Sequence, residues 1–194
     1  MKSQAFLQQL QEQVQAQLSI LNTDFEPLDI RALQFKPAPA SWSILECLEH
    51  LNRYARYYLP ALRKALAQEQ PTANPEAQVG FSWLGRKSYE AVRPENRKLQ
   101  KTLRHMNPAQ STLDRSVLPE FRQHQETLLR LLSRAAHTNL NRKAIPIEFF
   151  HLLKLRLGEA FLFVIAHQER HLQQAQRARQ QYQSQATNEL RLVV

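Results

Sequence analysis

The stretch Ala166-His167-Gln168-Glu169-Arg170-His171-Leu172 places two histidines four residues apart inside a segment with helical periodicity. Small or apolar residues continue the same line at steps of three and four: Leu157, Ala160, Val164, Ala175 and Ala178. The histidines therefore occupy positions at which a helix in a bundle normally presents Leu or Val. Because Cβ atoms at i and i+4 lie roughly 6 Å apart, both imidazoles can reach one metal ion. A third ligand is then expected from another helix.

The composition of the chain indicates one helical domain. Its 194 residues suffice for one sizeable hydrophobic core, so we expect a single domain over residues 1–194. Glycine occurs three times, whereas Gln, Leu, Ala, Arg and Glu are abundant, which favours an all-α fold. The single cysteine, Cys47, excludes an internal disulfide and is compatible with a reducing cytoplasm.

Four segments have the apolar spacing of amphipathic helices. The first covers about residues 4–22. The second begins at the capping box Ser43-Ile44-Leu45-Glu46 and continues to about residue 67. The third begins between residues 111 and 116 and continues to about residue 135, and the fourth covers about residues 157–181. These four segments predict a bundle of four helices.

Two connections between these helices are expected to be irregular. Residues 23–40 contain Pro27, Pro37 and Pro39 and lose the helical period, which predicts an extended segment. Residues 70–110 form a long connection between the second and third helices. A structureless loop of that length is unusual in a compact domain, so we expect a short helix around Ser88.

Proline and glycine also predict interruptions in the second helix and at the start of the fourth helix. Pro60 falls inside the second helix and removes a backbone donor, which predicts a kink near residues 56–60 or a break before the end of the helix at about residue 67. The apolar segment 147–153 is interpreted as a short helix or as the first turns of the fourth helix. Gly158 favours a break between this segment and the main part of the fourth helix.

The other histidines differ in how well they could complete a metal site. His50 lies beside the apolar seam of the second helix, which makes it a candidate third ligand once it is considered together with His167 and His171. Taken alone, it would more often be a histidine at the core edge that binds a carbonyl. His124, on the seam of the third helix, is interpreted as an ordinary buried or edge histidine.

Neither Gln168 nor Glu46 is indicated as a catalytic residue beside the histidines. Gln168 stands where a zinc peptidase of the His-Glu-x-x-His type carries its general base, so peptidase chemistry is disfavoured. Glu46 lies one turn before His50, but the capping box already explains it. His105, His137 and His151 lie in loops or near helix ends without an indicated partner. The sequence therefore identifies no catalytic residue besides candidate metal ligands.

Two motifs together resemble the DinB-like (YfiT-like) superfamily: Trp42-Ser43-x-x-Glu46-x-x-x-His50-Leu51, and His167-x-x-Arg170-His171-x-x-Gln174 far downstream. The resemblance spans nearly the whole chain. It implies a four-helix bundle with a long crossover connection between helices two and three. It also implies that His50, His167 and His171 bind a divalent metal ion, usually nickel or zinc, with coordination positions left open. Arg170 and Gln174 would then have structural or supporting roles.

The resemblance implies two activities and leaves the substrate open. Some members are transferases that use low-molecular-weight thiols, and others are metal-dependent hydrolases. A small-molecule substrate is therefore expected. A three-histidine site is compatible with either activity, because a divalent ion with an open position can lower the pKa of a water or hold a thiolate. In the main alternative, the metal only ties the second helix to the fourth, and His124 or Glu46 closes the site.

A second alternative uses the charge of the chain, which is +9 at pH 7. Residues 86–104 carry seven basic residues against Glu90 and Glu95, with Trp83 and Tyr89 available for stacking on bases. A nucleic-acid-binding module is nevertheless disfavoured, because such runs are usually solvated surface and no recognition motif is present. No apolar segment reaches the roughly 20 residues that span a bilayer, so we expect a cytoplasmic protein without a membrane partner. A homodimer is compatible with the sequence.

Overall fold

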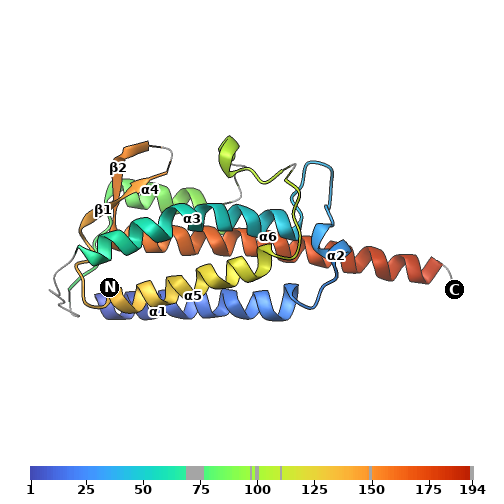
Figure 1. Ribbon diagram of the computed structural model, residues 1–194, viewed down its shortest axis with the longest axis horizontal. Coiled ribbons are helices and arrows are strands. Elements are labelled where there is room, and N and C mark those ends of the chain that lie inside the picture. Colours follow the sequence, from blue (N-terminus) through green and yellow to red (C-terminus); the bar gives the residue numbers. More distant parts are fainter. Residues whose placement is uncertain (69–76, 97, 99–100, 110, 149, 193–194) are drawn as a thin grey trace.

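The long helices of the protein run side by side (Figure 1). The computed structural model describes residues 1–68, 77–96, 98, 101–109, 111–148 and 150–192. The long helices are α1 (Ser3–Ile20), α3 (Ile44–Ala67), α5 (Val117–Ala135) and α6 (Leu157–Leu192). Helix α1 packs against α5 and α6, and α3 packs against the same two helices. The predicted all-α class is confirmed, and a small two-stranded sheet is added to it.

Helix α3 begins at the predicted capping box. The Glu46 N–H donates to the Ser43 hydroxyl over 3.2 Å, and the Ser43 N–H donates to a Glu46 carboxylate oxygen over 2.8 Å. These two bonds satisfy donors that the first turn of a helix leaves free. Pro60 lies inside the helix and is exposed, and the helix continues to Ala67. Of the two predicted alternatives, the break before the end of the helix is therefore wrong, because Pro60 lies on the solvent side of a continuous helix.

The connection at residues 23–40 is more structured than expected. The chain leaves α1 through a π-helical turn at Leu21–Phe25 and then forms α2 (Ile30–Gln34). Asp29 caps α2 by accepting the Ala32 N–H over 2.8 Å. The expectation of an extended segment is thus wrong for α2, because one capped turn needs too few residues to establish a period.

The short helix expected around Ser88 is present as α4 (Trp83–Val92), which packs against α6. Ser82 caps it by accepting the Gly85 N–H over 3.0 Å, and buried Glu159 at the start of α6 accepts the Ser82 N–H. A Cβ atom at Gly85 would lie 2.2 Å from the Glu159 side chain, so only glycine permits this approach. Residues 70–76, 97, 99–100 and 110 of the predicted connection lie outside the described residues.

The segment before α6 is a β-hairpin. Strand β1 (Lys143–Ile147) pairs antiparallel with β2 (Phe150–Arg156), and Ile147 lies opposite Phe150 across the turn. The helical interpretation of residues 147–153 is therefore wrong. Short apolar runs do not distinguish a strand from a helix by periodicity, and β-branched Ile145 and Ile147 were the signal for a strand. Helix α6 begins at Leu157, as predicted, but ends at Leu192.

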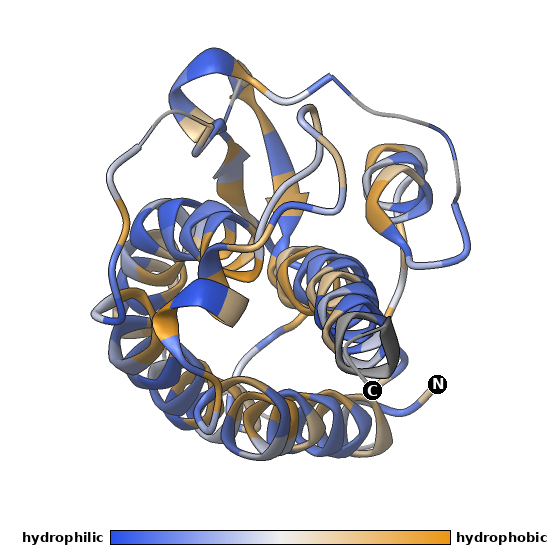
Figure 2. Ribbon diagram, turned by 90° about the vertical axis from the view of Figure 1, so that its right-hand side faces the viewer, coloured by the Kyte–Doolittle hydropathy of each residue, from blue (hydrophilic) through white to orange (hydrophobic). Residues whose placement is uncertain are grey.

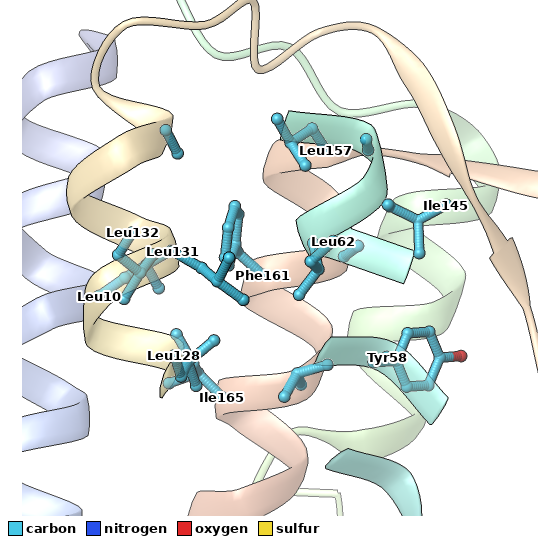
Figure 3. Close-up of a cluster of buried hydrophobic side chains, with 14 of the residues drawn as sticks. Leu10, Tyr58, Leu62, Leu128, Leu131, Leu132, Ile145, Leu157, Phe161 and Ile165 are labelled. Atoms are coloured by element: carbon cyan, nitrogen blue, oxygen red, sulfur yellow. The ribbon is translucent and has the colours of Figure 1, made fainter. Parts of the chain in front are cut away.

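Buried apolar side chains form two clusters along the helices. The first cluster lies toward the hairpin and includes Leu10, Leu62, Leu128, Phe161 and Ile165 (Figure 3). The second cluster lies around the start of α3 and includes Phe25, Leu48, Phe121 and Leu172. Viewed along the helices, each long helix has a hydrophobic and a hydrophilic side (Figure 2). The amphipathic pattern in the sequence is thus used to build one continuous interior.

A layer of buried polar residues separates the two clusters. We call it the polar layer, and it consists of Gln17, His50, Asn52, Gln125, His167 and Gln168. Along the chain, Gln17, Asn52, Gln125 and the pair His167-Gln168 fall between residues of the first cluster and residues of the second. His50 lies at the edge of the second cluster, between Leu48 and Leu51. The polar layer contains two of the three candidate ligands, and within it Gln125 contacts Gln17 and His50 contacts His167.

Candidate metal centre

Helices α3 and α6 bring His50, His167 and His171 together. The centroids of the three imidazole rings lie 4.6 to 5.0 Å from one another. One potential ligand atom from each residue lies within 4.8 Å of the other two. His50 and His167 are only 2% and 6% exposed. The three residues singled out in the sequence thus form one buried group.

The ring nitrogens have a spacing that suits a shared ion. The Nε2 atoms of His50 and His167 are 3.2 Å apart. Two imidazole nitrogens that bind one ion at about 2.1 Å are roughly 3.0 to 3.4 Å apart in octahedral or tetrahedral geometry. The spacing of this pair therefore fits a divalent transition-metal ion, and the candidate atom of His171 lies within 4.8 Å of both.

Two of the histidines are oriented through their second ring nitrogen. The Nδ1 atom of His50 donates to the Met106 carbonyl over 2.7 Å, and the Nδ1 atom of His171 lies 3.0 Å from the Gln174 amide oxygen. A neutral imidazole has one N–H, so a proton used at Nδ1 leaves the lone pair on Nε2. Such partners fix the tautomer and the ring orientation of metal ligands. The supporting role expected for Gln174 agrees with this contact.

Burial keeps the three imidazoles neutral. Desolvation lowers the pKa of His50 to about 4, although the bond to Met106 acts in the opposite direction. Desolvation and the neighbouring His50 lower the pKa of His171 to about 3. The pKa of His167 is also well below its usual value, because of burial and then of the two other rings. Neutral imidazoles have the free lone pair that metal binding requires.

Aromatic rings enclose the histidine group on several sides. The half-buried Trp42 ring lies 4.8 Å from His50 and 5.5 Å from His171, measured between ring centroids. The Tyr54 ring lies 4.9 Å from His50 and 4.4 Å from His167. Phe163 stacks on His167 at 5.9 Å. The histidine group is thus a polar centre in contact with three aromatic rings.

Arg170, between the two histidines of α6, holds the connection that follows α4. Its guanidinium donates to the carbonyl oxygens of Arg93, Asn96 and Lys98. Three carbonyls on one guanidinium fasten this loop beside the metal-ligand candidates. The structural role expected for Arg170 agrees with these bonds, and part of the basic segment 86–104 is thereby folded against α6.

The remaining acidic and histidine candidates have other partners. Glu46 uses its carboxylate in the capping box and in an ion pair with Lys36 at 2.6 Å. His124 contacts Asn52 at 3.1 Å, and burial lowers its pKa. Among the described His, Cys, Asp and Glu residues, His50, His167 and His171 are the sole group of three that could hold one ion. Neither Glu46 nor His124 closes the site.

The sequence interpretation missed a second polar feature, centred on Glu148 in the hairpin turn. His105, which was read as a loop residue without a partner, pairs with Glu148. The Glu148 side chain is 8% exposed, and its Oε2 atom has no hydrogen-bond partner in the described structure. The Tyr58 hydroxyl accepts the Glu148 N–H over 3.4 Å. No local pattern could have found this pairing, because it joins two loops that are 43 residues apart.

Cys47 is not a reactive thiol in this structure. It is fully buried in the second cluster, and burial, with the nearby Glu46 carboxylate, raises its pKa strongly. A buried thiol with a raised pKa is protonated and shielded from substrates. Any thiol chemistry at the histidine group would therefore need a thiol from outside the chain.

Comparisons with known proteins agree with the helical architecture and the two motifs. None of the described helices is long and apolar enough to cross a membrane. No curated protein and no solved structure matches the chain. A family model described as the DinB superfamily matches residues 10–175, a span that contains α3 with His50 and the part of α6 with His167 and His171. Because this match covers most of the chain, the protein belongs to the DinB superfamily.

Proposed function

We propose that the protein is a divalent-metal-dependent enzyme that acts on a small electrophilic molecule, with a low-molecular-weight thiol or water as the nucleophile. His50, His167 and His171 hold the ion. Nickel or zinc is expected, because imidazole ligands suit both. The observation that carries the proposal is the convergence of three neutral imidazoles without a fourth ligand among the described residues. Catalytic zinc sites keep such an open position, whereas structural sites are closed by four protein ligands.

Each part of the site has a definite task under this proposal. A divalent ion supplies a Lewis acid that lowers the pKa of the water or thiol that it binds. Trp42 and Tyr54 form apolar walls that exclude water beside the histidines. Met106 and Gln174 hold two of the rings in the required orientation. The thiol is a second substrate, because Cys47 is buried.

The first test is metal binding by the three histidines. We expect the purified protein to bind about one equivalent of Ni²⁺ or Zn²⁺ per chain, measured by elemental analysis after dialysis. His167→Ala should lose this binding, because two ligands remain. His137→Ala, which changes an exposed histidine after α5, is the matched control and should retain the metal. Absence of binding in the wild-type protein would exclude the proposed site.

The second test separates the two reactions. The metal-loaded protein is incubated with an aryl halide and L-cysteine, and the thioether and released halide are measured. The same protein is incubated with an activated ester in the absence of thiol. Thiol transfer forms a carbon–sulfur bond and releases halide and a proton, whereas hydrolysis adds water across the ester. Both activities should disappear in His167→Ala, and a rate that survives this change does not come from the site.

A noncatalytic metal site is the second candidate function. It is favoured by the position of the three histidines, which join α3 to α6 at the level between the two hydrophobic clusters. Cobalt-loaded protein distinguishes the candidates, because its visible spectrum responds to new ligands. A spectral change on addition of 2-mercaptoethanol indicates an open position and supports catalysis. An unchanged spectrum supports the noncatalytic candidate.

A further inference from the structure

We propose that Arg53 is a positioning residue for the metal centre, because it fixes the turn whose carbonyl sets the tautomer of His50. The turn is the 3₁₀ element η2 (Arg104–Met106). The effect on metal affinity rests on the proposed function. The effect on the His50 tautomer does not, because it can be measured without a metal ion.

The first step is the dependence of His50 on Met106. The His50 Nδ1–H donates to the Met106 carbonyl over 2.7 Å, and Nε2 then faces His167 with its lone pair. With the carbonyl displaced, the ring can carry its proton on Nε2 instead. Nε2 would then be unable to bind an ion. The position of one backbone oxygen thus decides whether His50 can act as a ligand.

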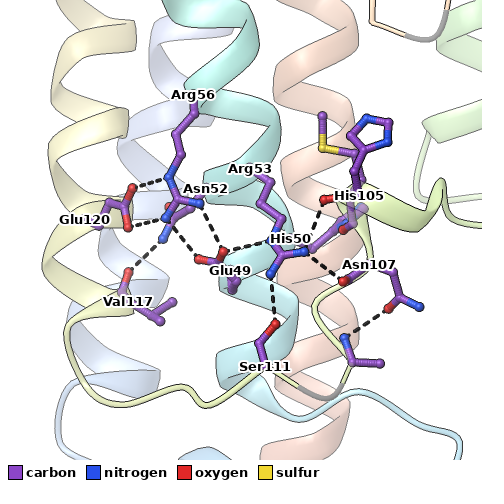
Figure 4. Close-up of polar contacts among 12 residues, drawn as sticks. Glu49, His50, Asn52, Arg53, Arg56, His105, Asn107, Ser111, Val117 and Glu120 are labelled. Carbon is purple, nitrogen blue, oxygen red and sulfur yellow. Dashed lines mark hydrogen bonds and ion pairs between the residues drawn. The ribbon is translucent and has the colours of Figure 1, made fainter.

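The second step is that Arg53 binds the residues on either side of Met106 and so holds the Met106 carbonyl in place (Figure 4). One guanidinium nitrogen, Nη1, donates to the carbonyls of His105 and Asn107, at 3.1 and 2.8 Å. These carbonyls lie on either side of Met106 in the chain. Nη2 donates to the Ser111 hydroxyl over 2.9 Å. Arg53 therefore fixes the turn at three points around the carbonyl that His50 needs.

The third step is that Arg53 is itself held in place. Its Nε donates to Glu49 over 2.8 Å, and Arg56 donates to the same carboxylate over 3.0 Å. Arg56 also pairs with Glu120 of α5 over 2.7 Å. A rigid fork fixed at Nε directs the two Nη atoms toward the turn.

The geometry of one helix explains why this arrangement works. Glu49, His50 and Arg53 all lie on α3, and Arg53 follows Glu49 by four residues and His50 by three. Residues at these spacings are neighbours on a helix surface. The same helix therefore supplies the ligand, the arginine that fixes the ligand's partner, and the carboxylate that fixes the arginine.

The test begins with metal-free protein, in which ¹⁵N NMR of labelled histidine reports the tautomer of His50. The wild-type protein should show the proton on Nδ1. Arg53→Ala should shift a substantial fraction of the population to the Nε2–H form. Arg53→Lys should give an intermediate result, because an ammonium cannot span the same carbonyls. Arg63→Ala removes an exposed arginine of the same helix and should leave the wild-type tautomer.

The second readout is the dissociation constant for Ni²⁺, measured by competition with a chromophoric chelator. Loss of an outer partner typically weakens metal affinity about 10–100-fold, and we expect a loss in this range for Arg53→Ala. Ser111→Ala removes one of the three bonds and serves if Arg53→Ala does not fold; it should weaken binding by a smaller factor. An unchanged His50 tautomer in folded Arg53→Ala or Arg53→Lys protein would overturn the proposal, whether or not the wild-type protein binds metal.

Discussion

The first cluster and the polar layer are carried by the same four helices, but they contribute to the protein in opposite ways. Phe161 and Val164 pack in the first cluster, and His167 follows on the next turn of α6 in the polar layer. Burial of an apolar ring is favourable in itself. Burial of an imidazole or a carboxamide is unfavourable unless each polar atom has a partner.

The polar layer is also incompletely satisfied. The buried Oε1 atoms of Gln125 and Gln168 have no hydrogen-bond partner among the described residues. Gln17 has two, because it donates to the Ile165 carbonyl over 3.1 Å and accepts from Gln125 over 2.7 Å. A layer that lowers stability at the centre of a domain is expected where function requires it. The comparison teaches that the first cluster holds the helices together, while the polar layer contains two of the three candidate ligands.

The largest effect is expected in the first cluster. Phe161→Ala should lower the free energy of unfolding by about 3–5 kcal/mol, because it leaves a cavity at a fully buried position. Denaturant titration of metal-free protein gives this value. Leu152→Ala is the matched control in β2; this side chain is 84% exposed, and the change should stay within about 0.5 kcal/mol. Equal losses for the two variants would contradict the assignment of the core.

The next largest effect is the gain in stability that Ni²⁺ gives through the histidines. At free Ni²⁺ 100-fold above the dissociation constant, the wild-type protein should gain about 2.7 kcal/mol of stability. His167→Ala should gain nothing, because it lacks a ligand. Phe161→Ala should lose the same free energy with and without Ni²⁺. Thermal unfolding at several Ni²⁺ concentrations measures all three, and equal metal responses of wild type and His167→Ala would remove the distinction between the two regions.

Much of the helical fold could be predicted because its signals are local. The capping box located the start of α3 at Ser43, and the prediction of a helix around Ser88 is confirmed by α4. Periodicity did not distinguish the hairpin from a helix, because its apolar run is short; the β-branched residues Ile145 and Ile147, which pack in the first cluster, were the one local signal for a strand. Local patterns fail where distant contacts decide the structure.

In the candidate site, too, local patterns identified some residues and distant contacts decided the others. His167 and His171 were found from their spacing on one helix. His50 was found from its position beside the apolar seam of the second helix, and the motif that resembles the superfamily agreed with it. The partner of His50 is the Met106 carbonyl, and every residue has a carbonyl, so no side-chain pattern could indicate it. The pairing of Glu148 with His105 likewise depends on how two loops fold.

A smaller effect tests whether stability and metal binding are separable. Ser43→Ala should lower the free energy of unfolding by about 1 kcal/mol, because it removes the hydroxyl that caps α3. The dissociation constant for Ni²⁺ should stay within about twofold, because the Ser43 side chain accepts its hydrogen bond from Glu46, which is not one of the candidate ligands. Ser184→Ala, at an exposed position of α6, serves as the control. A parallel loss of stability and metal affinity would show that the start of α3 and the polar layer act as one unit.

The smallest change in the free energy of unfolding is expected for Glu148→Gln, and its sign shows whether Glu148 stabilises or destabilises the fold. A buried acceptor without a partner costs about 1–3 kcal/mol, whereas the contact with His105, whose side chain is 62% exposed, contributes about 0–1 kcal/mol. Glu148→Gln removes the buried charge and keeps an oxygen for His105, but its new amide group also needs a partner. We therefore expect the free energy of unfolding to rise by at most about 1 kcal/mol.

Glu126→Gln, on the exposed face of α5, controls for the change in net charge. A loss of stability in Glu148→Gln alone would mean that the pair with His105 holds the hairpin to the η2 turn, and polar residues outside the polar layer would then also stabilise the fold.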